Sequence, residues 1–131
     1  FYEKRKEQIH EHLAGFENME DLLLYMGRKF VDQEGIANPF VIWMEGMWES
    51  ISIATRYIGL DPIKEILVHI CKDIVENSRG FPDLFVWDND TYEFVEVKSP
   101  TDNLSNRQLY WLNYFEANGI NARVLRVFFE D

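Results

Sequence analysis

Two carboxylates and one amine near the ends of two apolar runs are the residues of this sequence best suited to chemistry. Asp83 follows Pro82 at the start of the first run, and Glu96 and Lys98 lie two residues apart at the end of the second. Side chains alternate between the two faces of a strand, so Glu96 and Lys98 project from the same face. A hairpin of this length predicts that Asp83 approaches Glu96.

The chemistry open to this cluster depends on a divalent cation. Neighbouring carboxylates resist joint ionisation unless a cation neutralises them, and oxygen ligands suit Mg²⁺ or Mn²⁺. The backbone carbonyl of Val97 can supply a further oxygen. Such an ion polarises a phosphoryl oxygen and activates water, while Lys98 orients the water or stabilises the growing negative charge. The pattern predicts metal-assisted phosphodiester hydrolysis, with Asp83, Glu96 and Val97 as ligands.

The alternative interpretation of the same residues is an ordinary strand edge. A Glu-x-Lys pair on one strand face is often a solvated ion pair that stabilises little. Pro-Asp, an apolar strand, a turn and then Glu-Val-Lys form a more demanding pattern than the pair alone. Polar residues where a strand otherwise requires apolar ones are typical of functional sites.

The elements that position these residues lie in the second half of the chain. Residues 84–87 and 92–97 are apolar, aromatic or β-branched and flank the turn residues 88–90, which predicts a β-hairpin. Ser105 and Gln108 form a capping-box signature for a helix that ends at Asn118-Gly119. We expect the helix to turn these residues inward: Leu109, Leu112 and Phe115. Residues 122–129 alternate as a last strand, which can pair in parallel with residues 92–97.

The first half of the chain is predicted to be helical. We expect helices over residues 4–13, over 19–33 with Asn18 as N-cap, and over 47–57, with a short apolar stretch at 40–44. Asp61 is predicted to cap a fourth helix that has Pro62 at its first position and ends at 78–80. Its apolar residues recur at helical spacing: Ile63, Ile66, Leu67, Ile70, Cys71, Ile74 and Val75. The predicted fold is α/β, with a helical part at 1–79 and a core with a small mixed sheet at 80–131.

Composition limits the classes of partner. The 131 residues include 23 Asp and Glu against 13 Lys and Arg, a formal charge of −10 that repels phosphate on average, although a bound divalent ion inverts the field locally. The sequence has no apolar run of about 18 residues, so we expect no membrane span. The one cysteine excludes an internal disulfide framework. Phe1 is the first residue, so the chain is expected to continue upstream.

Several segments together carry a family resemblance. They are Gly-Phe-Pro-Asp-Leu at 80–84, Phe-Val-Glu-Val-Lys at 94–98, Leu-Ser-Asn-Arg-Gln at 104–108, Trp-Leu at 111–112, Gly-Ile at 119–120 and Val-Leu-Arg-Val at 124–127. In this set the chain resembles the VRR-NUC domain of the PD-(D/E)XK nuclease superfamily. Residues 35–39 and 58–80 resemble the bacterial members of the Fanconi-associated nuclease branch.

The resemblance implies a restriction-endonuclease-like core and a divalent-metal-dependent, structure-specific DNA nuclease. Such an enzyme cleaves 5′ flaps or branched DNA, as an endonuclease or 5′ exonuclease, in interstrand crosslink repair. By position, Asp83 and Glu96 resemble the metal carboxylates, Val97 the carbonyl ligand and Lys98 the catalytic lysine. Gln108 resembles the family's helix glutamine, placed at the site or at a backbone phosphate, and its role as a capping residue is equally well supported.

One family feature has no match by motif. The family has another metal-site glutamate on an upstream helix, and nothing selects among Glu3, Glu7 and Glu11. The expected partners are therefore DNA and an upstream part of the same polypeptide. The expected location is the cytoplasm or nucleoid, or the nucleus in a eukaryote. Two alternatives stay open: a non-catalytic DNA-binding or scaffolding module that keeps the nuclease fold, and a nuclease of Holliday junctions.

Overall fold

The computed structural model describes residues 1–37 and 43–130 and divides the chain into two compact units, Phe1–Asp73 and Ile74–Asp131. The sequence placed the boundary between residues 79 and 80. Residues 74–79 belong to the second unit because Asn77 bonds to a helix there: its Oδ1 accepts from Arg107 Nη2, and its carbonyl accepts from Trp111 Nε1.

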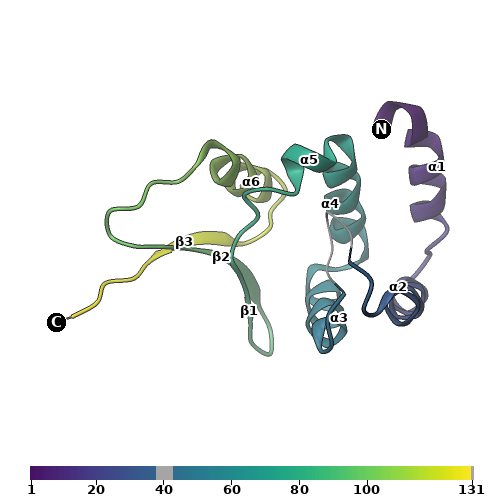
Figure 1. Cartoon of the computed structure of the whole chain (residues 1–131), viewed down its shortest axis with the longest axis horizontal. Coiled ribbons are helices and arrows are strands. Elements are labelled where there is room, and N and C mark those ends of the chain that lie inside the picture. The colour runs from purple at the N-terminus through teal and green to yellow at the C-terminus, as the bar shows by residue number, and fades with distance from the viewer. Residues whose placement is uncertain (38–42, 131) are drawn as a thin grey trace. The chain divides into compact units, whose positions relative to one another are not determined.

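The first unit consists of helices (Figure 1). They are α1 (Tyr2–Ala14), α2 (Met19–Gln33), α3 (Met47–Ile58) and α4 (Leu60–Lys72). The helices predicted over 4–13, 19–33 and 47–57 are confirmed, and so is the N-cap of α2, where Asn18 accepts from the Asp21 backbone at 2.9 Å. Of the predicted apolar stretch at 40–44, residues 40–42 lie outside the described part of the chain.

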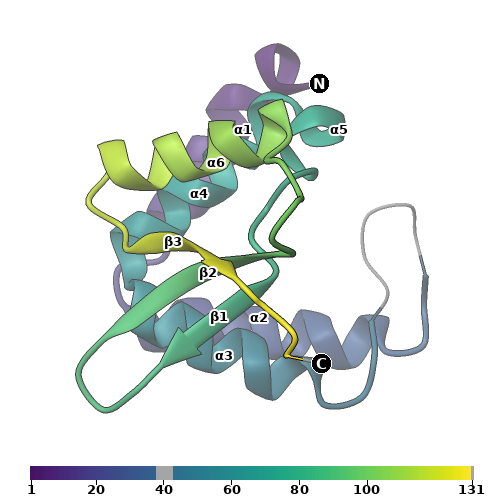
Figure 2. The same ribbon diagram turned by 90° about the vertical axis from the view of Figure 1, so that its left-hand side faces the viewer.

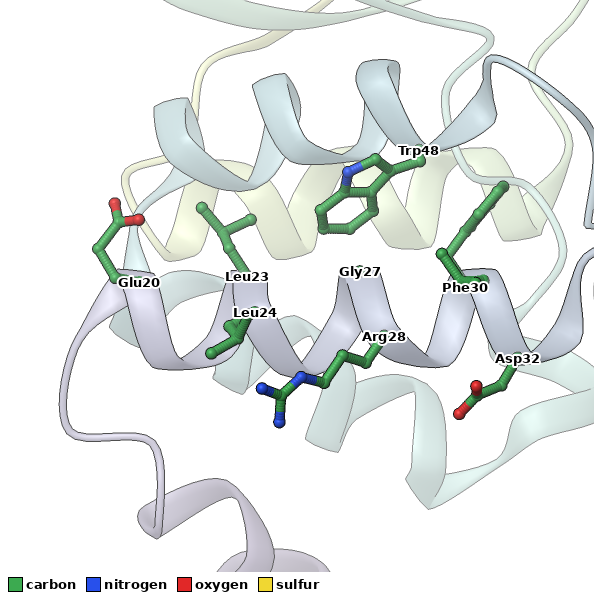
Figure 3. Close-up of a pocket in the computed structure, with 9 residues that line it drawn as sticks. Glu20, Leu23, Leu24, Gly27, Arg28, Phe30, Asp32 and Trp48 are labelled. Carbon is green, nitrogen blue, oxygen red and sulfur yellow. The ribbon is translucent and has the colours of Figure 1, made fainter.

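Apolar side chains between these helices form the core of the first unit. The buried set is Leu22, Leu23, Phe30, Ile58, Ile66 and Val68. Trp48 of α3 lies over Gly27 of α2, where an added Cβ would come within 3.0 Å of the indole (Figure 3). The two helices can therefore pack closely at this point because glycine has no Cβ.

The predicted start of α4 was wrong. The helix begins at Leu60, and its N-cap is Gly59 rather than Asp61. Gly59 has a φ of 93°, a conformation that glycine adopts without strain, so the chain turns directly from α3 into α4. Pro62 still lies in the first turn, where its missing N–H removes no bond within the helix.

The predicted end of α4 was also wrong. The helix stops at Lys72, since Asp73 has φ −149° and ψ 88° and breaks the hydrogen-bond ladder. A separate short helix, α5 (Ile74–Asn77), follows. Val75, expected in the apolar stripe, is 54% exposed as a result.

The second unit contains the predicted mixed sheet (Figure 2). Strands β1 (Leu84–Trp87) and β2 (Tyr92–Lys98) pair in antiparallel fashion, which confirms the hairpin. Strand β3 (Ala122–Arg126) pairs in parallel with β2 after the crossover helix α6 (Asn106–Ala117). The strand order is β1-β2-β3. The site residues therefore belong to the central strand and to the segments beside it.

Helix α6 packs through aromatic rings on the sheet face that carries Phe94. The centroids of Phe94 and Phe115 lie 4.6 Å apart with the rings stacked. Trp111 and Phe115 are completely buried, whereas Leu109, predicted to point inward, is 43% exposed. Residues four apart on a helix share a face, so a helix that buries 111 and 115 turns 109 outward.

The last strand is shorter than predicted. It ends at Arg126, and Phe128 and Phe129, expected to continue it, are 70% and 88% exposed. The reason lies in β2, which ends at Lys98, the register partner of Arg126. Residues 127–129 alternate in hydrophobicity as a strand does, but β2 offers no further strand residues with which they could pair.

Candidate functional site

The loop that carries Asp83 passes against the first turn of α6. Gly80 has a φ of 73°, and a Cβ there would lie 2.6 Å from the carbonyl carbon of Arg107. Phe81 follows and packs edge-on against Trp111, with the two ring centroids 4.8 Å apart. The glycine and the phenylalanine thus anchor the loop, and the next two residues bring Asp83 to the start of β1.

Asp83 reaches the end of β2, as the hairpin geometry predicts. Its Oδ2 accepts a hydrogen bond of 2.9 Å from the backbone N–H of Val97. Val97 lies between Glu96 and Lys98, so the three predicted side chains gather around one stretch of strand. Asp83 is exposed, which leaves its carboxylate open to solvent.

Glu96 is the buried member of the cluster, with 2% of its surface exposed. Its Oε1 accepts from Lys98 Nζ at 3.2 Å and from Gln108 Nε2 at 2.5 Å. Its Oε2 is buried and has no hydrogen-bond partner in the described protein. A buried carboxylate oxygen without a partner costs free energy, so this atom is where a cation would be stabilising.

Gln108 contacts the cluster and caps α6 at the same time. Its side-chain oxygen accepts from the Ser105 backbone at 2.9 Å, and its own backbone N–H donates to Ser105 Oγ at 3.2 Å. This confirms the predicted capping box. Because the oxygen of the amide is used in the cap, the amide nitrogen faces Glu96. The two roles considered for Gln108 are therefore compatible.

The turn after Lys98 adds residues that the sequence pattern did not identify. The Ser99 backbone donates to Asp102 Oδ2 at 3.3 Å, and Arg126 Nη1 donates to the Asp102 carbonyl at 2.8 Å. Hydrogen bonds from the Ser99 hydroxyl and backbone lower the pKa of Asp102, and the charges of Lys98 and Arg126 lower it further. The Ser-x-x-Asp spacing was a usable turn signal, but Arg126 had no local signal.

The donor set fits a hydrated hard cation. Asp83, Glu96 and the carbonyl of Val97 offer oxygen ligands, and the unpartnered Oε2 of Glu96 marks the position that lacks a positive charge. Residues 1–37 and 43–130 contain no group of three or more His, Cys, Asp and Glu side chains that could hold a metal ion. With two carboxylates and one carbonyl as candidate ligands, a bound ion would keep several waters, as Mg²⁺ does.

The upstream glutamate that the resemblance implies is not identified by the fold. Glu3, Glu7 and Glu11 all lie on the exposed surface of α1 in the first unit. In the part of the chain that the structure describes, no helix is both long and apolar enough to cross a bilayer.

This combination of fold and site defines a class of protein: the chain matches the VRR-NUC domain over residues 18–129 and belongs to that domain family. Among individual proteins, it is similar to the Fanconi-associated nuclease 1 homolog of Arabidopsis thaliana, with 32% identity over 97% of this chain and 15% of that protein. Fanconi-associated nuclease 1 of Homo sapiens is 29% identical over 82% of this chain and 11% of that protein. The predicted family is therefore confirmed.

A bacterial relative and a solved structure extend the comparison. The homolog from Pseudomonas aeruginosa is 32% identical over 66% of this chain and 16% of that protein. The crystal structure of paFAN1 bound to 2-nt 5′-flap DNA with a gap is similar with a TM-score of 0.82 and 25% identity, over 100% of this chain and 24% of that one. The predicted α/β fold is confirmed. The chain spans about a sixth or less of the curated relatives named here.

Proposed function

We propose that this domain hydrolyses phosphodiester bonds of DNA with the help of a divalent cation. One observation carries the proposal: within residues 1–37 and 43–130, the buried Oε2 of Glu96 has no hydrogen-bond partner. This carboxylate pairs with Lys98 through its other oxygen and adjoins Val97, whose backbone amide binds Asp83. A purely structural glutamate at this depth would have both oxygens paired. Membership of the VRR-NUC family supports the same chemistry.

The residues divide into ligands and groups that act on the substrate. Asp83, Glu96 through Oε2 and the carbonyl of Val97 would hold Mg²⁺ or Mn²⁺, which supplies the positive charge that polarises the phosphate and activates water. Lys98, whose side chain is 13% exposed, would use Nζ to orient the attacking water or to donate to the oxygen on which negative charge develops. Gln108 holds Glu96 Oε1, so that the carboxylate keeps one orientation.

The substrate we propose is flap or branched DNA, cleaved as an endonuclease or 5′ exonuclease during interstrand crosslink repair. The relatives named above are Fanconi-associated nucleases, and the structural neighbour holds 5′-flap DNA. The domain would act as part of a longer polypeptide, whose other parts supply a basic DNA surface. Its place would be the cytoplasm or nucleoid of a bacterium, or the nucleus of a eukaryote.

The test is an Asp83→Asn substitution, made in the longest form of the protein that expresses. Removing one ligand charge should reduce Mn²⁺-dependent cleavage of a labelled 5′ flap by at least about 100-fold, since even second-shell partners of a metal are worth about 10- to 100-fold. Asp90→Asn is the matched control, because Asp90 is an exposed residue of the hairpin turn. Unchanged cleavage in the Asp83 variant, with folding intact, would refute the proposal.

The lack of a matched upstream glutamate favours one other candidate, a DNA-binding or scaffolding module without catalysis. That candidate predicts DNA binding with no cleavage in Mg²⁺ or Mn²⁺, and no effect of Asp83→Asn. A Holliday-junction nuclease, the third possibility, predicts cleavage of four-way junctions in preference to flaps. Assaying both substrates with the same variants separates the three.

A further inference from the structure

The last residue of β3, Arg126, holds the turn that follows Lys98. Its Nη1 donates to the carbonyl of Ser99 at 3.0 Å and to that of Asp102 at 2.8 Å, with a longer contact of 3.5 Å to Pro100. Arg126 is also the register partner of Lys98 in the parallel pair of strands. One guanidinium nitrogen therefore ties the end of β3 to the segment that leaves the end of β2.

The same turn is closed from its other side by its own residues. The Ser99 backbone N–H donates to Asp102 Oδ2 at 3.3 Å, and the Asp102 backbone N–H donates to the Ser99 carbonyl at 3.3 Å. The Val127 N–H donates to the Lys98 carbonyl at 2.9 Å, just beyond Arg126. We call the bonds of Arg126 to this turn the Arg126 clasp. In the clasp, three carbonyl oxygens surround one guanidinium nitrogen, so its hydrogen bonds are charge-assisted.

The clasped segment connects the two elements that hold Glu96. Lys98, on β2, reaches Glu96 Oε1 from before the turn, and Gln108, on α6, reaches the same oxygen from after it. The capping box at Ser105 fixes Gln108 to the first residue after the connection. A change in the path of residues 99–104 would therefore alter how Gln108 meets this carboxylate oxygen, whereas Lys98 reaches it from the same strand.

From this arrangement we propose that Arg126 is a positioning residue for the Glu96 site. The clasp sets the path of residues 99–104, and through it the hydrogen bond from Gln108 to Glu96 and the direction of the unpartnered Oε2. Its effect on cation binding rests on the function proposed above. Its effect on the Gln108–Glu96 bond does not depend on that function.

Arg123 provides a matched control on the same strand. Its Nε donates to Glu93 Oε1 at 2.8 Å in a partly exposed ion pair at the other end of the β2–β3 ladder. Removing it deletes the same side chain from the same element without touching the turn after Lys98. An exposed pair of this kind contributes little to stability.

The experiment compares Arg126→Ala, Arg126→Lys and Arg123→Ala in this chain by three measurements. They are the thermal midpoint, the side-chain amide resonances of Gln108 in ¹H–¹⁵N spectra without metal, and Mn²⁺ affinity by calorimetry. We expect Arg126→Ala to shift or broaden the Gln108 amide signals and to weaken Mn²⁺ binding about tenfold, the lower end of the range for outer-shell partners. Arg126→Lys should keep part of the wild-type Gln108 signals and part of the Mn²⁺ affinity, because a single nitrogen makes all the clasp bonds.

Two outcomes would overturn the proposal. One is an Arg126→Ala variant with a lower thermal midpoint but Gln108 signals identical to those of Arg123→Ala, which would make Arg126 merely structural. The other, if Arg126→Ala does not fold, is an Arg126→Met variant, which keeps an apolar stem but has no donor, with Gln108 signals identical to those of Arg123→Ala. If the unmodified chain binds no Mn²⁺, the proposed function fails, and the Gln108 resonances still decide the clasp.

Discussion

The two oxygens of one buried carboxylate differ in their surroundings, and this difference is the central chemical feature of the protein. Glu96 Oε1 accepts from Lys98 and Gln108, while Oε2 has no protein partner among the described residues. A domain selected for stability alone would pair or remove such an atom. An unpaired buried oxygen near the end of β2 breaks the usual pattern of a strand, and the proposed cation site rests on it.

At this scale, the prediction concerns cation-dependent stability. A ligand that binds only the folded state stabilises it by about 2.7 kcal/mol at about 100 times its Kd. We expect Mn²⁺ to raise the thermal midpoint of this chain relative to EDTA, and Glu96→Gln to lose most of that rise because the Oε2 charge is gone. Glu93→Gln, on the same strand but in the exposed pair with Arg123, should keep it. An equal rise in both variants would exclude Glu96 as a ligand.

At the scale of elements, the site depends on how closely the loop before β1 passes the start of α6. Gly80 lies against the Arg107 backbone, and Phe81 packs between Phe94 and Trp111. The Arg107 side chain in turn bonds to the carbonyl of Glu76 at 3.1 Å. These contacts fix where β1 begins, and therefore where Asp83 meets β2.

A Gly80→Ala substitution tests this contact. The added Cβ would lie 2.6 Å from a backbone carbon, which cannot move as a flexible side chain can, at a φ of 73°. We expect a loss of roughly 2–4 kcal/mol in the free energy of unfolding, from left-handed strain plus overpacking. Gly119→Ala has a similar φ of 68° but nothing within 4 Å, so it isolates the strain, roughly 1–2 kcal/mol. Equal losses by urea denaturation would show that the close approach is unimportant.

For the whole molecule, the balance of charge sets how DNA can be held. A formal charge of −10 gives little net attraction for phosphates, and the chain spans only 15% of its Arabidopsis thaliana relative. Lys98, Arg107 and Arg126 already bond to protein oxygens. The proposed hydrolysis would therefore act on DNA that other parts of a longer polypeptide bring to this domain.

The corresponding prediction concerns salt dependence. Affinity for DNA falls with salt in proportion to the number of phosphates that a protein neutralises, with a log–log slope of about −0.9 for each. We expect this chain alone to bind a labelled 5′ flap weakly, with a slope no steeper than about −2 in fluorescence anisotropy titrations. A steep slope would show a basic surface that the composition does not suggest, and it would count against the need for further DNA-binding parts.

Local signals were enough to predict much of the second unit. The hairpin over 84–97, the capping box at Ser105 and Gln108, and the approach of Asp83 to the end of β2 all follow from strand alternation, turn chemistry or hydrogen bonds between near neighbours in sequence. The start of α4 and the break at Asp73 were missed, because Gly59 and the separate packing of residues 74–77 overrode the helical pattern.

The tertiary structure decided which atoms of the site are buried and which have hydrogen-bond partners. Neither the burial of Glu96, nor the lack of a partner at Oε2, nor the Arg126 clasp has a local sequence signal. Each depends on segments that meet only after folding: β2 with α6 for Glu96, and β3 with the turn after Lys98 for Arg126. Residue types and spacing specify which groups are available, whereas desolvation and pairing depend on long-range packing.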